Sequence, residues 1–173
     1  KNIAAAAMTL AVVFGAASLK PVTANAAEAS VSASIEEENS YISFQDEAYQ
    51  NEFLRRVNNE RAKAGLKPVQ LGDSNHNSAA QERAEEIATV NSHVRPNGTK
   101  WYTVLSEYGV TDAAAGENAA WGSVSPEEVV NAWMNSEGHR ANILDPEARA
   151  MGVGYYYNSS STWGHQWIQL FTK

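Results

Sequence analysis

The densest group of reactive side chains lies in residues 133–144, with the sequence WMNSEGHRANIL. Ser136, Glu137 and His139 stand close together there, beside Trp133 and a closing apolar pair. Hydroxyl, carboxylate and imidazole groups supply nucleophiles, proton transfer or metal ligands. We therefore take His139, with Glu137 or Ser136, as the centre of a candidate site that earlier parts of the chain must complete.

Two earlier residues are suited to complete it. His93 lies in a loop directly after a predicted helix, and Glu117 follows Gly116 at a predicted strand start, where solubility does not require a carboxylate. If the fold brings them to Glu137 and His139, two imidazoles and one or two carboxylates form a divalent-metal site, and neutral histidines suit zinc. Taken singly, a loop histidine is more often a surface or capping residue, and a lone glutamate is more often solvated.

A hydrolytic site is the alternative chemistry. Ser136 would be activated by His139, with Glu117 orienting the imidazole. The sequence contains neither a nucleophile-elbow GxSxG motif nor a metal-binding HExxH motif. Each chemistry therefore depends on how the fold arranges these side chains.

Composition narrows the classes of partner. The chain has 173 residues, enough for one domain and an appendage, and a formal charge of −7. No cluster of lysine and arginine suggests a phosphate-binding surface, so we expect no nucleic-acid partner. The absence of cysteine excludes disulfides and thiolate metal sites.

The first 26 residues predict export. Lys1 precedes an apolar run over residues 3–19, and Ala24-Asn25-Ala26 is a small-x-small cleavage pattern. We interpret residues 1–26 as a signal peptide, residues 27–45, rich in Ala, Ser and Glu, as a flexible linker, and residues 46–173 as the globular domain. The prediction is a secreted or extracellular monomer, with association with the cell envelope as a variant, and no membrane contact after cleavage.

Helical periodicity dominates the first part of the domain. Tyr49, Phe53 and Val57 recur every four residues before a stop at Gly65. A second helix begins at Asp73 or Ser74 and presents small residues inward. A third begins with the cap Ser125, followed by Pro126 and Glu128. We expect this third helix to run into residues 133–144 and to break at Gly138, so that His139 faces the site.

The C-terminal part changes to a period of two. Residues 151–157 and 163–171 alternate as strands, and residues 158–162 (NSSST) join them as a hairpin. Both faces of the last strand carry bulky residues, which predicts a central strand covered by helices on both sides. Helices first and strands last favour an α+β sandwich.

Several motifs in order resemble one known family. They are Asn58-x-x-Arg61, Gly65-Leu66-Lys67-Pro68, Ala79-Ala80-x-x-Arg83-Ala84, Ser92-His93-x-Arg95-Pro96-x-Gly98, Gly116-Glu117-Asn118, Trp133-x-x-Ser136-x-Gly138-His139-Arg140-x-Asn142-Ile143-Leu144 and Trp167-x-Gln169-x-Phe171. The set resembles the CAP superfamily of SCP-like proteins (cysteine-rich secretory proteins, antigen 5 and pathogenesis-related proteins), and within it the bacterial secreted branch. The resemblance covers residues 46–173.

The resemblance implies a three-layer α-β-α sandwich with a cleft lined by two histidines and two acidic residues. His93, Glu117 and His139 match three of these positions. The fourth falls on Ser136, three residues after the helix tryptophan, with Glu137 next to it. The family further implies that His93 and His139 bind zinc or another divalent cation, and that the ligand is a small molecule, a lipid or a peptide.

Three functions follow as hypotheses. The first is a secreted, non-enzymatic binding module whose cleft, formed by His93, Glu117, Ser136, Glu137 and His139, holds a divalent cation and a ligand. The second is a metal-assisted or Ser/His hydrolase acting on peptide or cell-wall substrates. The third is an interaction module with a vestigial cleft, whose partner is a host or cell-surface protein.

Overall fold

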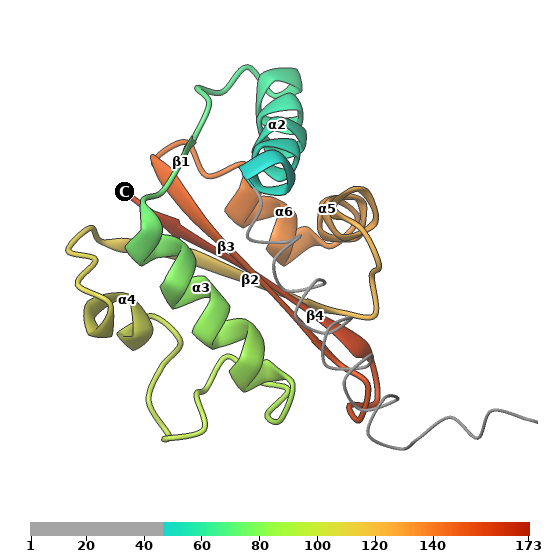
Figure 1. The fold of residues 1–173 in the computed structure, drawn as a ribbon. Helices are drawn as coiled ribbons and strands as arrows, with labels where there is room; N and C mark the ends of the chain where they lie inside the picture. The colour runs from blue at the N-terminus through green and yellow to red at the C-terminus, as the bar shows by residue number, and fades with distance from the viewer. Residues whose placement is uncertain (1–46) are drawn as a thin grey trace, which may run out of the picture.

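The sheet at the centre of the molecule has helices on both sides. The computed structural model describes residues 47–173. In chain order its elements are α2 (Glu47–Lys63), β1 (Gln70–Leu71), α3 (Ser74–Ile87), α4 (Thr103–Glu107), β2 (Ala114–Trp121), α5 (Pro126–Met134), α6 (Glu137–Ile143), β3 (Ala150–Asn158) and β4 (Gly164–Thr172). Figure 1 shows α3 and α4 on one side of the sheet and α2, α5 and α6 on the other. The predicted α-β-α sandwich is confirmed, whereas the predicted signal peptide and linker lie outside the described residues.

The sheet has the strand order β1-β3-β4-β2. The predicted C-terminal hairpin forms, because β3 and β4 pair antiparallel from Ala150 with Thr172 to Asn158 with Gly164. β2 pairs antiparallel with the other side of β4, and β1 pairs parallel with the start of β3. β1 was not predicted as a strand, because its two residues are too few to produce a periodic pattern.

Both faces of β4 are buried, as its bulky residues predicted. Trp167 and Phe171 contribute to a core with Phe53 of α2 and Trp133 of α5. Phe53 stacks against Trp167 and meets Trp133 edge to face, at centroid distances of 6.2 Å and 5.8 Å. The opposite face packs on α3 through its small residues, so the two sides of the sheet have separate cores.

The helix ends follow their local signals. Asp73 caps α3 by accepting hydrogen bonds from the backbone amides of Asn75 and His76. Ser125 caps α5 by accepting from the Glu128 amide at 3.2 Å, with Pro126 in the first turn. Gly65, at φ 73°, follows α2 in the left-handed conformation that favours glycine. The predicted starts of these two helices and the predicted stop are therefore confirmed.

The prediction of a break at Gly138 is wrong. α5 ends at Met134, and α6 begins at Glu137 with Ser136 in the cap position, so Gly138 lies within α6. Asn135 and Ser136 make the break: the Asn135 side chain donates to the Asn131 carbonyl, and Ser136 adopts an extended backbone. Arg61 of α2 then anchors the end of α6, since its Nη1 donates to the carbonyls of Ile143 and Asp145 at 2.8 and 2.9 Å.

Helix α3 approaches β3 so closely that two strand positions must be glycine. A Cβ on Gly152 would lie 2.3 Å from the His76 carbonyl oxygen, and one on Gly154 would lie 2.1 Å from that of Ala80. Two α3 amides also serve the strand backbone: Asn77 Oδ1 accepts from the Val153 amide, and Gln81 Oε1 accepts from the Tyr155 amide. Helix side chains thus satisfy backbone donors of β3 beyond its short pairing with β1.

Within residues 47–173, no helix combines the length and apolar character needed to cross a membrane.

Candidate functional site

The candidate site is built around the edge strand β2. Successive side chains of a strand point to opposite faces, so Glu117 and Asn118 face different layers of the sandwich. Glu117 points toward α3, where Arg83 meets it, and Asn118 points toward α6, where Asn142 meets it. Both side chains are buried.

Arg83 holds the Glu117 carboxylate in a two-point contact. Its Nε donates to Oε2 at 2.9 Å, and its Nη2 donates to Oε1 at 3.2 Å. Arg83 is fully buried, and it also donates to Glu86 Oε2 at 2.6 Å and to the Ser92 carbonyl at 3.1 Å. A bidentate arginine fixes a carboxylate in position and direction. Arg83 therefore gives the buried Glu117 side chain a partner of opposite charge.

His93 is oriented by the same carboxylate. Its Nδ1 lies 2.6 Å from Glu117 Oε1, while its side chain remains 59% exposed. The hydrogen bond to Glu117 raises the pKa of His93, with burial and the Arg83 charge opposing the rise. Because Nδ1 faces the carboxylate, Nε2 is the ring nitrogen that can meet a ligand, as in the carboxylate-histidine pairs of metal sites.

His139 reaches this region from the other side of the sheet. Asn118 Nδ2 donates to the His139 carbonyl and to Gln169 Oε1, both at 3.1 Å. The His139 ring lies 6.4 Å from the Trp133 ring, centroid to centroid. Burial lowers the pKa of His139, and the positive charge of His93 lowers it further. A charge on His93 therefore disfavours a charge on His139, although the two residues belong to different layers.

Asn142 joins the α6 layer to β2. Its Nδ2 donates to Asn118 Oδ1 at 2.8 Å and to the Glu117 carbonyl at 3.1 Å. A Cβ on Gly116 would lie 2.7 Å from the Asn142 side chain, so this close approach requires glycine there. Trp133 Nε1 adds a bond to the Ala119 carbonyl at 3.2 Å. These bonds satisfy two edge carbonyls of β2 and keep α6 in place.

The structure brings some of the predicted residues together and not others. His93 and Glu117 are in direct contact. The His139 backbone carbonyl accepts from Asn118, the residue after Glu117, and the charge of His93 contributes to lowering the His139 pKa. Ser136 takes the cap position of α6 without a side-chain hydrogen bond, and Glu137 is exposed in the first turn. No hydrogen bond within the described chain joins Ser136 or Glu137 to His93, Glu117 or His139.

The expected role of Glu117 in a Ser136–His139 pair is wrong. Glu117 orients His93 rather than His139, so the third member of a hydrolytic triad is absent from the position where it was expected. Ser136 and His139 lie in the cap and first turns of the same short helix. This geometry does not support the activated serine that the hydrolytic alternative requires.

The donor set at the site is too small for a closed metal site. Among residues 47–173, no three or more His, Cys, Asp or Glu side chains form a group suited to hold a metal ion. Both Glu117 oxygens already accept hydrogen bonds. Of the predicted site residues this leaves the two imidazoles of His93 and His139 without a metal-excluding role, whereas a structural zinc site would need four protein ligands.

Two residues of the site, Arg83 and Asn118, were not predicted from the sequence. Arg83 lies on the inner, small-residue face of α3, where an arginine is unusual and signals a buried partner. Asn118 has no comparable signal, since its three side-chain hydrogen bonds involve residues far away in the sequence.

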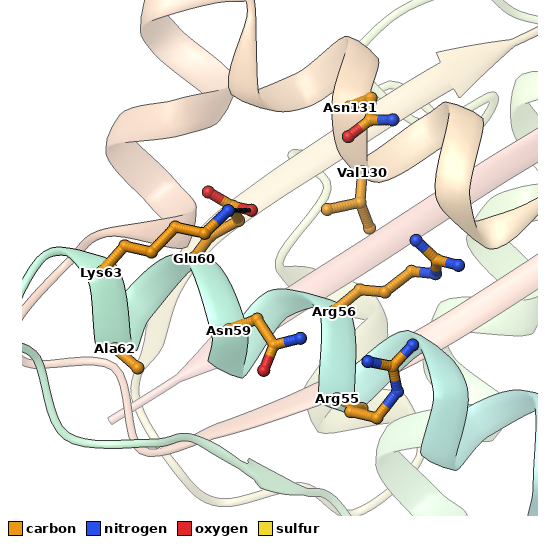
Figure 2. A pocket seen from close by; sticks show the side chains of 8 residues that line it. All are labelled: Arg55, Arg56, Asn59, Glu60, Ala62, Lys63, Val130 and Asn131. Carbon is orange, nitrogen blue, oxygen red and sulfur yellow. Dashed lines mark hydrogen bonds and ion pairs between the residues drawn. The ribbon is translucent and has the colours of Figure 1, made fainter.

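A separate pocket of about 490 Å³ lies between α2 and α5. Figure 2 shows its lining, with Arg55, Arg56 and Lys63 projecting from α2 and Asn131 from α5. Each of these cations already has a carboxylate partner: Glu52 pairs with both arginines, Glu127 with Arg56, and Glu60 with Lys63. The cations that line the pocket are therefore compensated, and none of the predicted site residues lines it.

Comparison with known proteins identifies the family. The sequence motifs implied a three-layer sandwich with His93, Glu117 and His139 at one cleft, and the fold has these layers, with Glu117 on the edge strand in contact with His93. The model of the cysteine-rich secretory protein (CAP) family matches residues 54–171. The chain belongs to the CAP family.

Bacterial proteins are among its relatives. The chain is 41% identical over 123 residues to the protein YkwD of Bacillus subtilis, covering 70% of this chain but only 47% of YkwD. It also resembles the crystal structure of an extracellular protein containing an SCP domain from Bacillus anthracis, with 25% identity and a TM-score of 0.62 over 71% of this chain and 39% of that one. The chain thus spans less than half the length of both relatives.

An outer surface protein of Borrelia burgdorferi has the same fold over most of both chains. Its TM-score is 0.63 at 20% identity, covering 73% of this chain and 93% of that protein. This similarity concerns the fold alone.

Proposed function

We propose that this chain is an extracellular, non-enzymatic CAP-domain binding module. Its site at the β2 edge would take a divalent cation, zinc or a similar ion, between His93 and His139, with a small-molecule, lipid or peptide ligand beside it. The observation that carries the proposal is the 2.6 Å contact of Glu117 with His93 Nδ1, which directs Nε2 of an exposed ring outward.

The surroundings of the two histidines support binding of a cation. A neutral imidazole is the form that ligates metal, and the lowered pKa of His139 favours that form. Glu117 strengthens the basicity of His93 and fixes its tautomer. When bound, the ion would supply a Lewis-acidic centre for a polar group of the ligand. With two protein ligands, it would keep coordination positions open for that group.

Extracellular placement has two supports. The Bacillus anthracis relative is described as an extracellular protein, and the Borrelia burgdorferi protein with this fold as an outer surface protein. The N-terminal export pattern agrees with both. Expression of the whole chain in a Gram-positive host, followed by immunoblotting of medium and cells, tests this part; retention of the protein in the cytoplasm would refute it.

Zinc calorimetry tests the cation site. We expect the whole chain to bind zinc with a stoichiometry near one, and the double variant His93→Ala, His139→Ala to give only the heat of dilution. Glu117→Gln should weaken binding by about tenfold or more, because it removes the carboxylate behind His93. Glu137→Gln serves as the matched control, since Glu137 is exposed and lies outside the proposed ligand set.

Equal zinc heats from the wild type and the double histidine variant would overturn the cation proposal. Turnover of peptide, ester or cell-wall substrates that depends on His139 would overturn its non-enzymatic part. A chain without zinc binding that still captures a cell-surface protein through other residues would favour the vestigial-cleft hypothesis instead.

A further inference from the structure

The end of the β3–β4 hairpin exposes aromatic surface outside the His93–His139 site. Trp163 is 57% exposed and Tyr157 37%, and the nearby Val124 is 62% exposed. Figure 1 shows this turn at the end of the sheet away from the C-terminus. We call Tyr157, Trp163, Val124 and the turn residues 158–162 the hairpin-end surface. The strand register places Tyr157 and Trp163 at the same end of the hairpin, next to the Asn158–Gly164 pair, so two exposed aromatic residues flank one turn.

The hairpin-end surface belongs to a long uncharged part of the chain. From Ala150 to Thr172 there is no Asp, Glu, Lys or Arg. A charged side chain that contacts it is acidic: Glu128 Oε2 accepts from the Val124 amide at 2.9 Å. Lysine and arginine are what attract phosphate groups and anionic lipids. The surface therefore suits an uncharged partner rather than a polyanion or an anionic membrane.

Two glycines support the exposed rings. A Cβ on Gly122 would lie 4.0 Å from Trp163 Cε3, and one on Gly164 would lie 3.3 Å from Tyr157 Cε2. Both glycines have positive φ, 83° and 68°, which the backbone turns require. Trp163 thus lies near the Gly122 backbone and Tyr157 near Gly164 and the His165 ring, at 4.9 Å between centroids, and both rings keep an exposed part.

The turn between the strands is ordered by its own hydrogen bonds. Asn158 Oδ1 accepts from the Ser160 amide at 2.9 Å, and Ser161 Oγ accepts from the Gly164 amide at 3.0 Å. The Ser161 hydroxyl also donates to the Asn158 carbonyl at 2.9 Å. Ser159, Ser160 and Thr162 remain exposed around this framework. A pre-ordered polar turn loses little entropy when it binds.

We propose that the hairpin-end surface binds an uncharged glycan chain. A sugar ring presents a face of C–H bonds, which packs on an aromatic ring, and a rim of hydroxyls, which exchange hydrogen bonds with serine and threonine. Trp163 and Tyr157 supply the rings, and the turn supplies the hydroxyls. This function is separate from the His93–His139 site, so either can fail without the other.

Calorimetric titration of the whole chain with chitohexaose and with cellohexaose tests the proposal. We expect binding of at least one of these neutral oligosaccharides. Trp163→Ala should weaken it by about tenfold, the effect of losing one aromatic anchor, and Tyr157→Ala should weaken it by several-fold. Trp163→Phe should retain most of the affinity because it keeps a ring. Tyr102→Ala is the matched control: Tyr102 is 44% exposed but lies outside this surface.

Three results would overturn the glycan proposal. They are the absence of binding to both oligosaccharides, equal affinity of the wild type and Trp163→Ala, and a loss in Tyr102→Ala equal to that in Trp163→Ala. Sedimentation with phosphatidylcholine vesicles, in the absence of oligosaccharide binding, would assign the surface to lipid instead. Thermal unfolding of each variant confirms that the comparison is made between folded proteins, and the double variant His93→Ala, His139→Ala should bind the oligosaccharide normally.

Discussion

The two sides of strand β2 hold their histidines by different means. On the α3 side, Glu117 lies in a charged network with Arg83 and His93. On the α6 side, the next residue, Asn118, lies in a neutral amide network with Asn142 and Gln169. One strand position thus separates a network of ion pairs from a network of amides.

This difference explains why the two histidines differ. In the charged network, Glu117 hydrogen-bonds the His93 ring itself and raises its pKa. In the amide network, Asn118 hydrogen-bonds only the His139 backbone carbonyl. Burial is therefore the main influence on the His139 ring, and it lowers the ring's pKa. The site therefore pairs an imidazole that readily accepts a proton with one that resists protonation.

Breaking the charged network should have the largest effect. Arg83→Met leaves the buried Glu117 carboxylate without its principal partner, and we expect the free energy of unfolding to fall by about 3 kcal/mol or more. Urea denaturation measures it. Arg55→Met is the control, because that arginine is exposed and solvent screens its ion pair with Glu52, so we expect little change in stability. Equal losses in the two variants would contradict the role given to Arg83.

Breaking the amide network should cost less. Asn118→Ala removes three hydrogen bonds and leaves the buried Gln169 Oε1 without its donor, so we expect a loss of about 2 kcal/mol. The same denaturation series measures the change. Asn135→Ala is the comparison, since its single side-chain bond is exposed; an equal loss there would refute the importance of the amide network.

Titration distinguishes the networks without breaking the fold. By NMR, the ring protons of His93 should titrate above the ordinary histidine pKa of about 6.5, and those of His139 below it. His93 should therefore add stability that is complete below its unfolded pKa and is lost as the pH rises through its folded value. His139 should act in the opposite way: its contribution is present above the unfolded pKa and is lost as the pH falls through the folded one.

Glu117→Gln sharpens this titration. The variant should lower the His93 pKa, since it removes the carboxylate that favours the charged ring. The His139 pKa should then rise where a less charged His93 repels it less. Unchanged midpoints for both rings would show that the charged network does not control them.

The smallest effect is expected at Glu137. This residue is exposed and has no part in either network, so Glu137→Gln should change the free energy of unfolding by less than about 0.5 kcal/mol. Both histidine titrations should also remain as in the wild type. A shift of the His139 midpoint comparable with that in Glu117→Gln would restore Glu137 as its partner.

Local features were predictable from the sequence. Caps and stops such as Asp73, Ser125 and Gly65 act within one helical turn, and alternation identified the two long strands of the hairpin. The family motifs supplied the layer arrangement and three of the site positions. Ser136 is a local feature too, but the expected break was assigned to Gly138, because glycine is the more frequent helix terminator.

The pairing within the site was not predictable from neighbouring residues. Glu137 stands beside Ser136 and near His139 in sequence, but it points to solvent, whereas the contact of His93 is with Glu117, 24 residues away. Arg83 is 34 residues from Glu117 and meets it only because α3 packs on the sheet. Such contacts follow from packing of layers, which no local pattern encodes.

The close packing of α3 against β3 also affects a strand edge on which another chain could pair. An unpaired strand edge is a template on which another chain can add a strand and start aggregation. Here Asn77 and Gln81 already occupy the amides of Val153 and Tyr155 where an invading strand would bind. Glycine at 152 and 154 lets the helix come near enough to do so. The same contact that packs the core therefore also blocks these edge amides against strand addition.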